Sequence, residues 1–216
     1  MPSPQHLIFD FDGTLIDSAP SILAGFAAAL AEQKVEAKLP LDKSLIGPPL
    51  KETLRRISGQ DDEAVLQALI DAFKAHYDTE GYKASAVYEG VPEMLRALKA
   101  AGYTLHIATN KRLLPTEKIL AYLGWTPLFD TIYALDKVSP AFANKGAMIG
   151  GQLAAENIPA TDALYLGDKA EDGHASDANT LPFIAVAWGY GDFVNGEMRP
   201  HWRLAQTPAG VSALLG

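Results

Sequence analysis

The 216-residue sequence contains no cysteine, which excludes disulfide bonds, thiol catalysis and zinc sites built on sulfur. It has no run of about 18 consecutive apolar residues, so we expect no membrane-spanning helix. Basic residues are few: 18 Lys and Arg against 26 Asp and Glu give a formal net charge of −8. Without a basic cluster, nucleic acid and anionic membrane surfaces are not expected partners. A small anionic substrate is not excluded, because the charge of a local site can oppose the net charge.

The beginning of the sequence lacks the features of an export signal. Residues 1–6 have neither a basic region nor a long apolar core. We therefore expect a cytoplasmic protein. The hydrophobic content of 48% is ordinary for a globular chain, and the length allows a core domain with a smaller insert.

The stretch FDFDGTLIDS, residues 9–18, is the most informative part of the sequence. It follows a predicted buried strand at 7–9, and side-chain alternation places Asp10 and Asp12 on the same side of the chain. Gly13 then allows a sharp turn. Two adjacent carboxylates repel each other, and Mg²⁺, which prefers oxygen ligands, would relieve that repulsion. With a metal present, Asp10 could attack phosphorus and Asp12 could transfer a proton. The alternative is a strand end and a helix cap with solvated acids.

The alternation of strands and helices after residue 85 predicts an α/β fold, with a Rossmann-like, doubly wound parallel sheet as its core. The predicted strands are 7–9, 103–108, 131–134, 163–166, 183–186 and 201–204. The predicted core helices are 91–101, 115–123, 145–156, 171–179 and 208–215.

Residues 18–84 show only helical patterns, with helices predicted at about 20–34, 50–57 and 61–79. We therefore predict a core domain formed by residues 1–17 and 85–216. An all-helical domain, residues 18–84, is inserted into it just after the first strand.

Other polar residues follow the predicted strands at the edge where open parallel sheets bind ligands. We expect four carboxylates to converge on a cation: Asp10, Asp12, Asp168 and Asp172. We expect a hydroxyl, an amide and an ammonium group to converge on a tetrahedral anion: Thr109, Asn110 and Lys145. A metal, a nucleophile and clamps for phosphoryl oxygens are what phosphoryl transfer requires. Taken singly, each residue also has an ordinary interpretation as a helix cap, a turn or a solvated side chain.

These motifs resemble those of the haloacid dehalogenase superfamily, in its phosphatase branch. The matching segments are DFDGTL at 10–15, ATNK at 108–111, Lys145 and LGDKAED at 166–172, in the order typical of the family. They span nearly the whole chain. The helical insert resembles the family's helical cap domain, and the Thr-Asn-Lys triplet resembles phosphoglycolate phosphatase-like proteins.

The resemblance implies a Mg²⁺-dependent phosphatase that hydrolyses small phosphate monoesters through an aspartyl-phosphate intermediate. Its partner would be a small phosphorylated metabolite such as 2-phosphoglycolate, and the sequence leaves open a monomer or a homodimer. Asp10 would be the nucleophile, and Asp12 would protonate the leaving alcohol and then activate water.

For the metal and the phosphate, the resemblance implies further roles. Mg²⁺ would be held by Asp10, the backbone carbonyl of Asp12 and Asp168, with Asp172 in support. Thr109 and Lys145 would bind the phosphate, and Asn110 would position the loop.

Two positions depart from the family pattern, and a second lysine and other functions remain as alternatives. Lys145 is followed by glycine where relatives often have proline, and Lys137 is an alternative phosphate ligand. Lys169 stands where many relatives carry Ser or Thr. A phosphomutase and a non-catalytic binding protein of this fold remain alternatives. The helical insert and the pair Asp168 and Asp172 argue against a phospho-acceptor signalling domain, and Asp12 argues against a dehalogenase.

The insert also offers residues that would select the substrate. The proline-stiffened segment 47–51 joins two predicted helices and emerges near Asp10. Lys51, Arg55 and Arg56 would offer charge to a carboxylate-bearing leaving group; the alternative is that they are solvated. Residues 188–191, Trp-Gly-Tyr-Gly, are interpreted as an aromatic loop that follows a strand end beside the site.

Overall fold

The computed structural model describes residues 4–215. Its central feature is a six-stranded sheet in the order β5-β4-β1-β6-β7-β8, in which every neighbouring pair is parallel. The strands are β1 (His6–Phe9), β4 (Thr104–Thr109), β5 (Thr131–Ala134), β6 (Ala163–Gly167), β7 (Phe183–Val186) and β8 (Arg203–Ala205). The predicted α/β core is confirmed.

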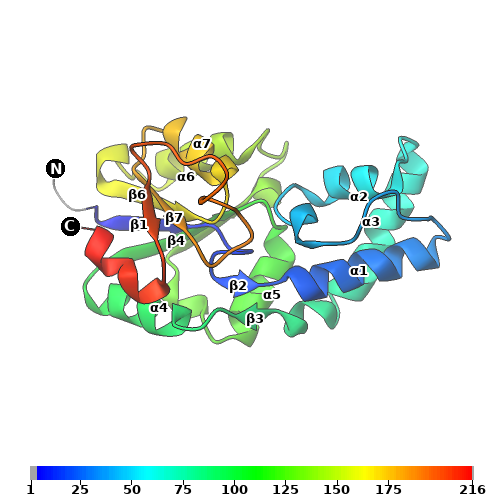
Figure 1. Ribbon diagram of the computed structural model, residues 1–216, viewed down its shortest axis with the longest axis horizontal. Coiled ribbons are helices and arrows are strands. Elements are labelled where there is room, and N and C mark those ends of the chain that lie inside the picture. The colour runs from blue at the N-terminus through cyan, green and yellow to red at the C-terminus, as the bar shows by residue number, and fades with distance from the viewer. Residues whose placement is uncertain (1–3, 216) are drawn as a thin grey trace.

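Helices cover both faces of this sheet (Figure 1). Because β-strand side chains alternate, Leu7 and Phe9 of β1 pack into one hydrophobic cluster and Ile8 packs into another. The first cluster includes residues of α4 (Val91–Ala100) and α5 (Leu113–Tyr122), and the second includes residues of α6 (Lys145–Ala155) and α7 (Ala170–Asp177).

Three helices form a separate group beside the sheet: α1 (Ala19–Glu32), α2 (Leu50–Ser58) and α3 (Glu63–Tyr77). The Asp62 side chain caps α3, and Gly59 ends α2 in the left-handed conformation. These helices and the segments that join them, residues 33–49 and 59–62, are called the helical unit below; it has its own hydrophobic cluster, which includes Phe26, Leu45, Leu54 and Phe73.

The chain enters and leaves the helical unit along two short paired segments. These are β2 (Ile16–Asp17) and β3 (Ala86–Val87), which pair antiparallel. The sequence does not reveal this pairing, because a two-residue strand is too short to show an alternating pattern.

The C-terminal segment differs from the prediction. Instead of a helix over 208–215, it forms two single turns of 3₁₀ helix, η6 (Pro208–Gly210) and η7 (Ser212–Leu214). Pro208 and Gly210 disfavour a longer helix. The remaining 3₁₀ turns are η1 (Lys43–Leu45), η2 (Gly81–Ala84), η3 (Thr126–Leu128), η4 (Leu135–Lys137) and η5 (Ala160–Asp162). None of the helices between residues 4 and 215 combines the length and apolar character that a membrane span requires.

Candidate active site

The predicted site residues gather at the carboxyl edge of the central strands. Asp10 follows β1, Thr109 ends β4 and Asp168 follows β6, and these three strands are neighbours in the sheet. Lys145 is the first residue of α6, and Asp172 lies in the first turn of α7. All five side chains are buried. The topology thus joins residues that lie far apart in the sequence.

Three carboxylates form a tight cluster. Asp10, Asp168 and Asp172 each offer an oxygen atom, and these atoms all lie within 4.8 Å of one another. The Lys145 ammonium lies 2.5 Å from Asp172 Oδ1 and 3.1 Å from Asp10 Oδ1. Lys145 therefore pairs with two of the three buried carboxylates.

Burial and the neighbouring charges shift the pKa values of the groups in this cluster. Burial raises the pKa of Asp10 well above its usual range, although the charge of Lys145 opposes the shift. Burial and the charge of Asp172 raise the pKa of Asp168 to about 7. Burial alone would lower the pKa of Lys145, but the charges of Asp10 and Asp172 outweigh it and raise that pKa.

The cluster fits a bound cation. Asp168 Oδ1 is buried and has no hydrogen-bond partner among the described residues. An unpaired buried acceptor is costly, and a cation would satisfy it while it neutralises the neighbouring acids. An all-oxygen ligand set suits a hard divalent ion. The three carboxylates could therefore hold a metal.

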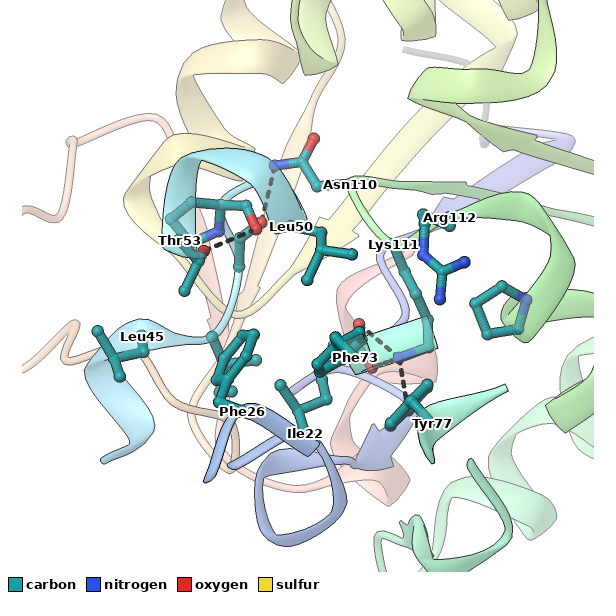
Figure 2. A pocket seen from close by; sticks show the side chains of 15 residues that line it. Ile22, Phe26, Leu45, Leu50, Thr53, Phe73, Tyr77, Asn110, Lys111 and Arg112 are labelled. Atoms are coloured by element: carbon teal, nitrogen blue, oxygen red, sulfur yellow. Dashed lines mark hydrogen bonds and ion pairs between the residues drawn. The ribbon is translucent and has the colours of Figure 1, made fainter. Parts of the chain in front are cut away.

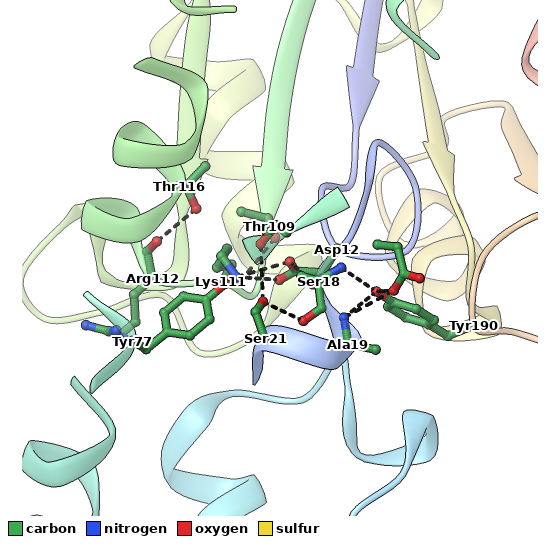
Figure 3. A network of polar contacts seen from close by, with 12 residues as sticks. Asp12, Ser18, Ala19, Ser21, Tyr77, Thr109, Lys111, Arg112, Thr116 and Tyr190 are labelled. Carbon is green, nitrogen blue, oxygen red and sulfur yellow. Dashed lines mark hydrogen bonds and ion pairs between the residues drawn. The ribbon is translucent and has the colours of Figure 1, made fainter. Parts of the chain in front are cut away.

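Asp12 does not belong to this cluster. Its carboxylate accepts hydrogen bonds from Lys111 Nζ at 3.1 and 3.3 Å and from Ser18 Oγ at 2.5 Å (Figure 3). Lys111 Nζ also donates to Tyr77 Oη of α3, at 2.8 Å. Of the four carboxylates that were predicted to converge, three therefore do so, and Asp12 instead faces the helical unit.

Two glycines of the site leave room for carboxylate side chains that a Cβ atom would overlap. Gly13 has φ +88°, and a Cβ atom there would lie 2.3 Å from Asp168 Oδ2. A Cβ at Gly167 would lie 2.5 Å from the Asp172 side chain. Gly13 therefore lets the first motif pack against Asp168, and Gly167 leaves room for Asp172 within its own motif.

The Thr109–Asn110 segment lies between the sheet and the helical unit. Thr109 Oγ1 accepts from the backbone N–H of Lys111 at 3.2 Å, in a turn. Asn110 Nδ2 donates to the carbonyl oxygen of Gly47 at 3.0 Å and to Glu171 at 3.1 Å. Asn110 thus connects this loop to the segment before α2 and to α7, and its positioning role stays a prediction.

Tyr190 joins the carboxylate cluster to the start of the helical unit, a link that sequence reasoning missed. Its backbone N–H donates to Asp168 Oδ2 at 2.7 Å. Its hydroxyl accepts from the backbone N–H groups of Ser18 and Ala19 and donates to Asp17 (Figure 3). The aromatic loop at a strand end was the available signal for its position, but no pattern indicated these partners.

Other lysines lie away from the predicted contacts. Lys137 donates to the carbonyl oxygen of Ile132 at the surface, 2.5 Å away, and does not reach the cluster. Lys169 donates to the carbonyl oxygen of Ile46 in the helical unit. The Lys169 ammonium group therefore points to the segment between η1 and α2.

A cavity of about 490 Å³, measured with its open mouth, lies between the helical unit and the core (Figure 2). The helical unit supplies an apolar wall, and the core supplies Asp12, Asn110, Lys111 and Arg112. Lys51, Arg55 and Arg56 are not among the lining residues. Lys51 and Arg55 instead pair with the exposed acids Asp61 and Glu63, so the expectation that they face a ligand is wrong.

The sequence and the fold resemble those of known proteins. Residues 7–186 match the family model described as haloacid dehalogenase-like hydrolase. A phosphoglycolate phosphatase from Xylella fastidiosa is 33% identical over 193 residues, which cover 87% of this chain and 82% of the relative. The structure of a predicted phosphatase from Clostridium acetobutylicum has a TM-score of 0.85 at 25% identity and covers 98% of this chain and 99% of that one.

A further relative is the tyrosine-protein kinase PtkA of Mycobacterium tuberculosis. It is 32% identical over 198 residues, which cover 89% of this chain. The chain spans 66% of the length of that relative, just under two thirds.

Proposed function

The chain belongs to the haloacid dehalogenase-like hydrolase family, and from this premise we propose that it is a hydrolase of phosphate monoesters, a Mg²⁺-dependent phosphatase acting through an aspartyl phosphate on Asp10. The observation that carries the proposal is the buried cluster of Asp10, Asp168 and Asp172 with Lys145 at the carboxyl edge of the sheet.

The proposed reaction has two steps. An Asp10 oxygen attacks phosphorus and the ester P–O bond breaks, while Asp12 donates a proton to the departing oxygen. Asp12 then takes a proton from water, which attacks the phosphoryl group, releases inorganic phosphate and regenerates the Asp10 carboxylate.

The other residues bind and orient. Lys145 and the Thr109 hydroxyl would hold phosphoryl oxygens. Asp10, the backbone carbonyl of Asp12 and Asp168 would hold Mg²⁺, supported by Asp172. When bound, the metal would neutralise the charge of the acids and of the phosphoryl group.

We further propose that the helical unit, within residues 18–84, is a cap domain over this site. The support is its own hydrophobic cluster and its connection through the β2–β3 pair. Polar contacts hold it against the core, notably Lys111 with Tyr77 and Arg112 with Asp78. The relative's name makes 2-phosphoglycolate a substrate to test.

The test combines metal removal with one isosteric variant. Hydrolysis of 4-nitrophenyl phosphate should stop with EDTA and return with Mg²⁺. Asp10→Asn should abolish activity and the trapping of labelled phosphate on the protein, while Asp71→Asn, an exposed acid on α3, should leave both intact. Activity indifferent to chelator, or phosphate trapped on a residue other than Asp10, would refute the proposal.

A further inference from the structure

The cavity between the helical unit and the core lies on the Asp12 side of the proposed reaction centre. Asp12 lines it, whereas Asp10, Thr109 and Lys145, the residues proposed to contact the phosphoryl group, do not. Since Asp12 is the proposed proton donor to the departing oxygen, the organic part of a substrate would extend from Asp12 into this cavity. The assignment rests on the proposed function.

The wall supplied by the helical unit is apolar. Its apolar side chains include Ile22, Phe26, Leu45, Leu50 and Phe73 (Figure 2), and Ile46, Pro48 and the ring of Tyr77 also line the cavity. Phe73 connects the wall, with its ring centroid 5.0 Å from that of Phe26 and 5.2 Å from that of Tyr77. Such a surface gains free energy by covering apolar groups and loses it by desolvating charge.

Both cations that line the cavity from the core side are already paired. Lys111 has only 5% of its side chain exposed and contacts Asp12 and Tyr77. Arg112 binds Asp78 through two nitrogen atoms, a fork-like contact that leaves it little freedom to take another carboxylate. A carboxylate entering the cavity would have to compete with these acids.

The other polar groups that line the cavity also offer little to a carboxylate. Thr53 Oγ1 donates to the carbonyl oxygens of Pro48 and Pro49, and Asn110 Nδ2 is engaged by Gly47 and Glu171. Asn110 Oδ1 has no hydrogen-bond partner among residues 4–215, and as an acceptor it repels an anion.

We propose that this cavity selects phosphate monoesters whose organic group is uncharged and apolar, and that it discriminates against carboxylate-bearing substrates such as 2-phosphoglycolate. The specificity-determining residues are those of the apolar wall, rather than the surface cations of α2.

The first test needs no variant. Isobutyl phosphate and 2-phosphoglycolate carry organic groups of nearly the same shape, one apolar and one a carboxylate. The kcat/KM for isobutyl phosphate should be higher by about 10-fold or more, and kcat/KM should rise along methyl, propyl and pentyl phosphate. A preference for 2-phosphoglycolate, or a flat alkyl series, would overturn the proposal.

The second test places a cation in the wall. Leu50 is the first residue of α2 and is partly exposed, so a lysine there has a route to solvent. Leu50→Lys should shift the kcat/KM ratio toward 2-phosphoglycolate by about 10-fold or more. The neighbouring Lys51 pairs with Glu63 outside the cavity, so Lys51→Ala is the matched control and should leave the ratio unchanged. Equal shifts from both variants, or none from either, would contradict the role of the cavity wall.

Acetyl phosphate separates a failure of this proposal from a failure of the proposed function. Its small organic group makes little use of the apolar wall. If acetyl phosphate is hydrolysed with Mg²⁺ but the apolar preference is absent, the substrate assignment is wrong. If no phosphate compound is hydrolysed, the proposed function itself fails.

Discussion

Replacing Asp168 by asparagine should stabilise the metal-free protein. The pKa of Asp168 is raised to about 7 from an ordinary value of 3.8, by burial and by the charge of Asp172. Between these two pH values the folded state binds a proton that the unfolded state has released, so stability falls as the pH rises from 4 to 7. Above pH 7 the folded protein carries the whole cost of the ionised, buried Asp168.

The magnitude follows from the shift. About 3 pH units at 1.36 kcal/mol each set an upper limit of about 4 kcal/mol for the cost of ionised Asp168. In Asp168→Asn the new side chain would keep an oxygen to accept the Tyr190 N–H bond, and its amide nitrogen would place a donor beside the remaining carboxylates. A gain of only about 1 kcal/mol would raise the Tm of a chain of this size by roughly 2–4 °C.

Thermal unfolding with EDTA at pH 8 and at pH 5 measures this gain. Asp168→Asn should unfold at a higher temperature than the parent at pH 8, and the difference should shrink at pH 5, where Asp168 is protonated. With Mg²⁺ the order should reverse, because only the parent keeps all three carboxylates to bind the ion.

Asp177→Asn is the matched control, because hydrogen bonds from His201, Trp202 and Arg199 outweigh burial and lower the pKa of Asp177. The same chemical change should therefore reduce stability there, with or without Mg²⁺. If Asp168→Asn is no more stable than the parent in EDTA at pH 8, the account of the cluster as a destabilising site is wrong.

Three further outcomes are expected. Lys145→Ala should lower kcat/KM by about 100-fold or more, whereas Lys137→Ala, at the surface, should leave it within about twofold; equal losses would remove Lys145 from the phosphate site. Gly13→Ala, with φ +88° and its Cβ 2.3 Å from Asp168, should lower the Tm and weaken Mg²⁺-induced stabilisation, and unchanged values of both would count against this close packing. Burial lowers the pKa of His106 to about 4, so its own contribution to stability should be lost as the pH falls from about 6.5 toward 4, opposite in sign to that of Asp168; His106→Gln should therefore gain stability relative to the parent over this range in unfolding measurements, and a difference that does not change with pH would contradict it.

Local patterns in the sequence predicted the elements that carry the site. The apolar run before Asp10 and the alternation of strands and helices indicate a parallel sheet, because such runs must be buried on both faces. Strands that are parallel end at the same edge, so Asp10, Thr109 and Asp168 are predicted at one edge of the sheet, and the strand order β4-β1-β6 then makes them neighbours. Lys145 is likewise predicted by its place at a helix start. These inferences need only local periodicity and one general rule of topology.

The tertiary structure alone decided what surrounds these residues. Lys111 pairs with Asp12 and Tyr77, and Tyr190 bonds to both Asp168 and the start of α1, across chain separations that no local pattern encodes. Lys51 looked like a ligand for a substrate, yet it lies at the surface beside Glu63. The physical reason is that a side chain's partners depend on how separate elements pack, and several nearby acids can compete for one cation. The sequence therefore determines which groups reach the sheet edge, while the packing of the helical unit determines which of them are free to meet a ligand.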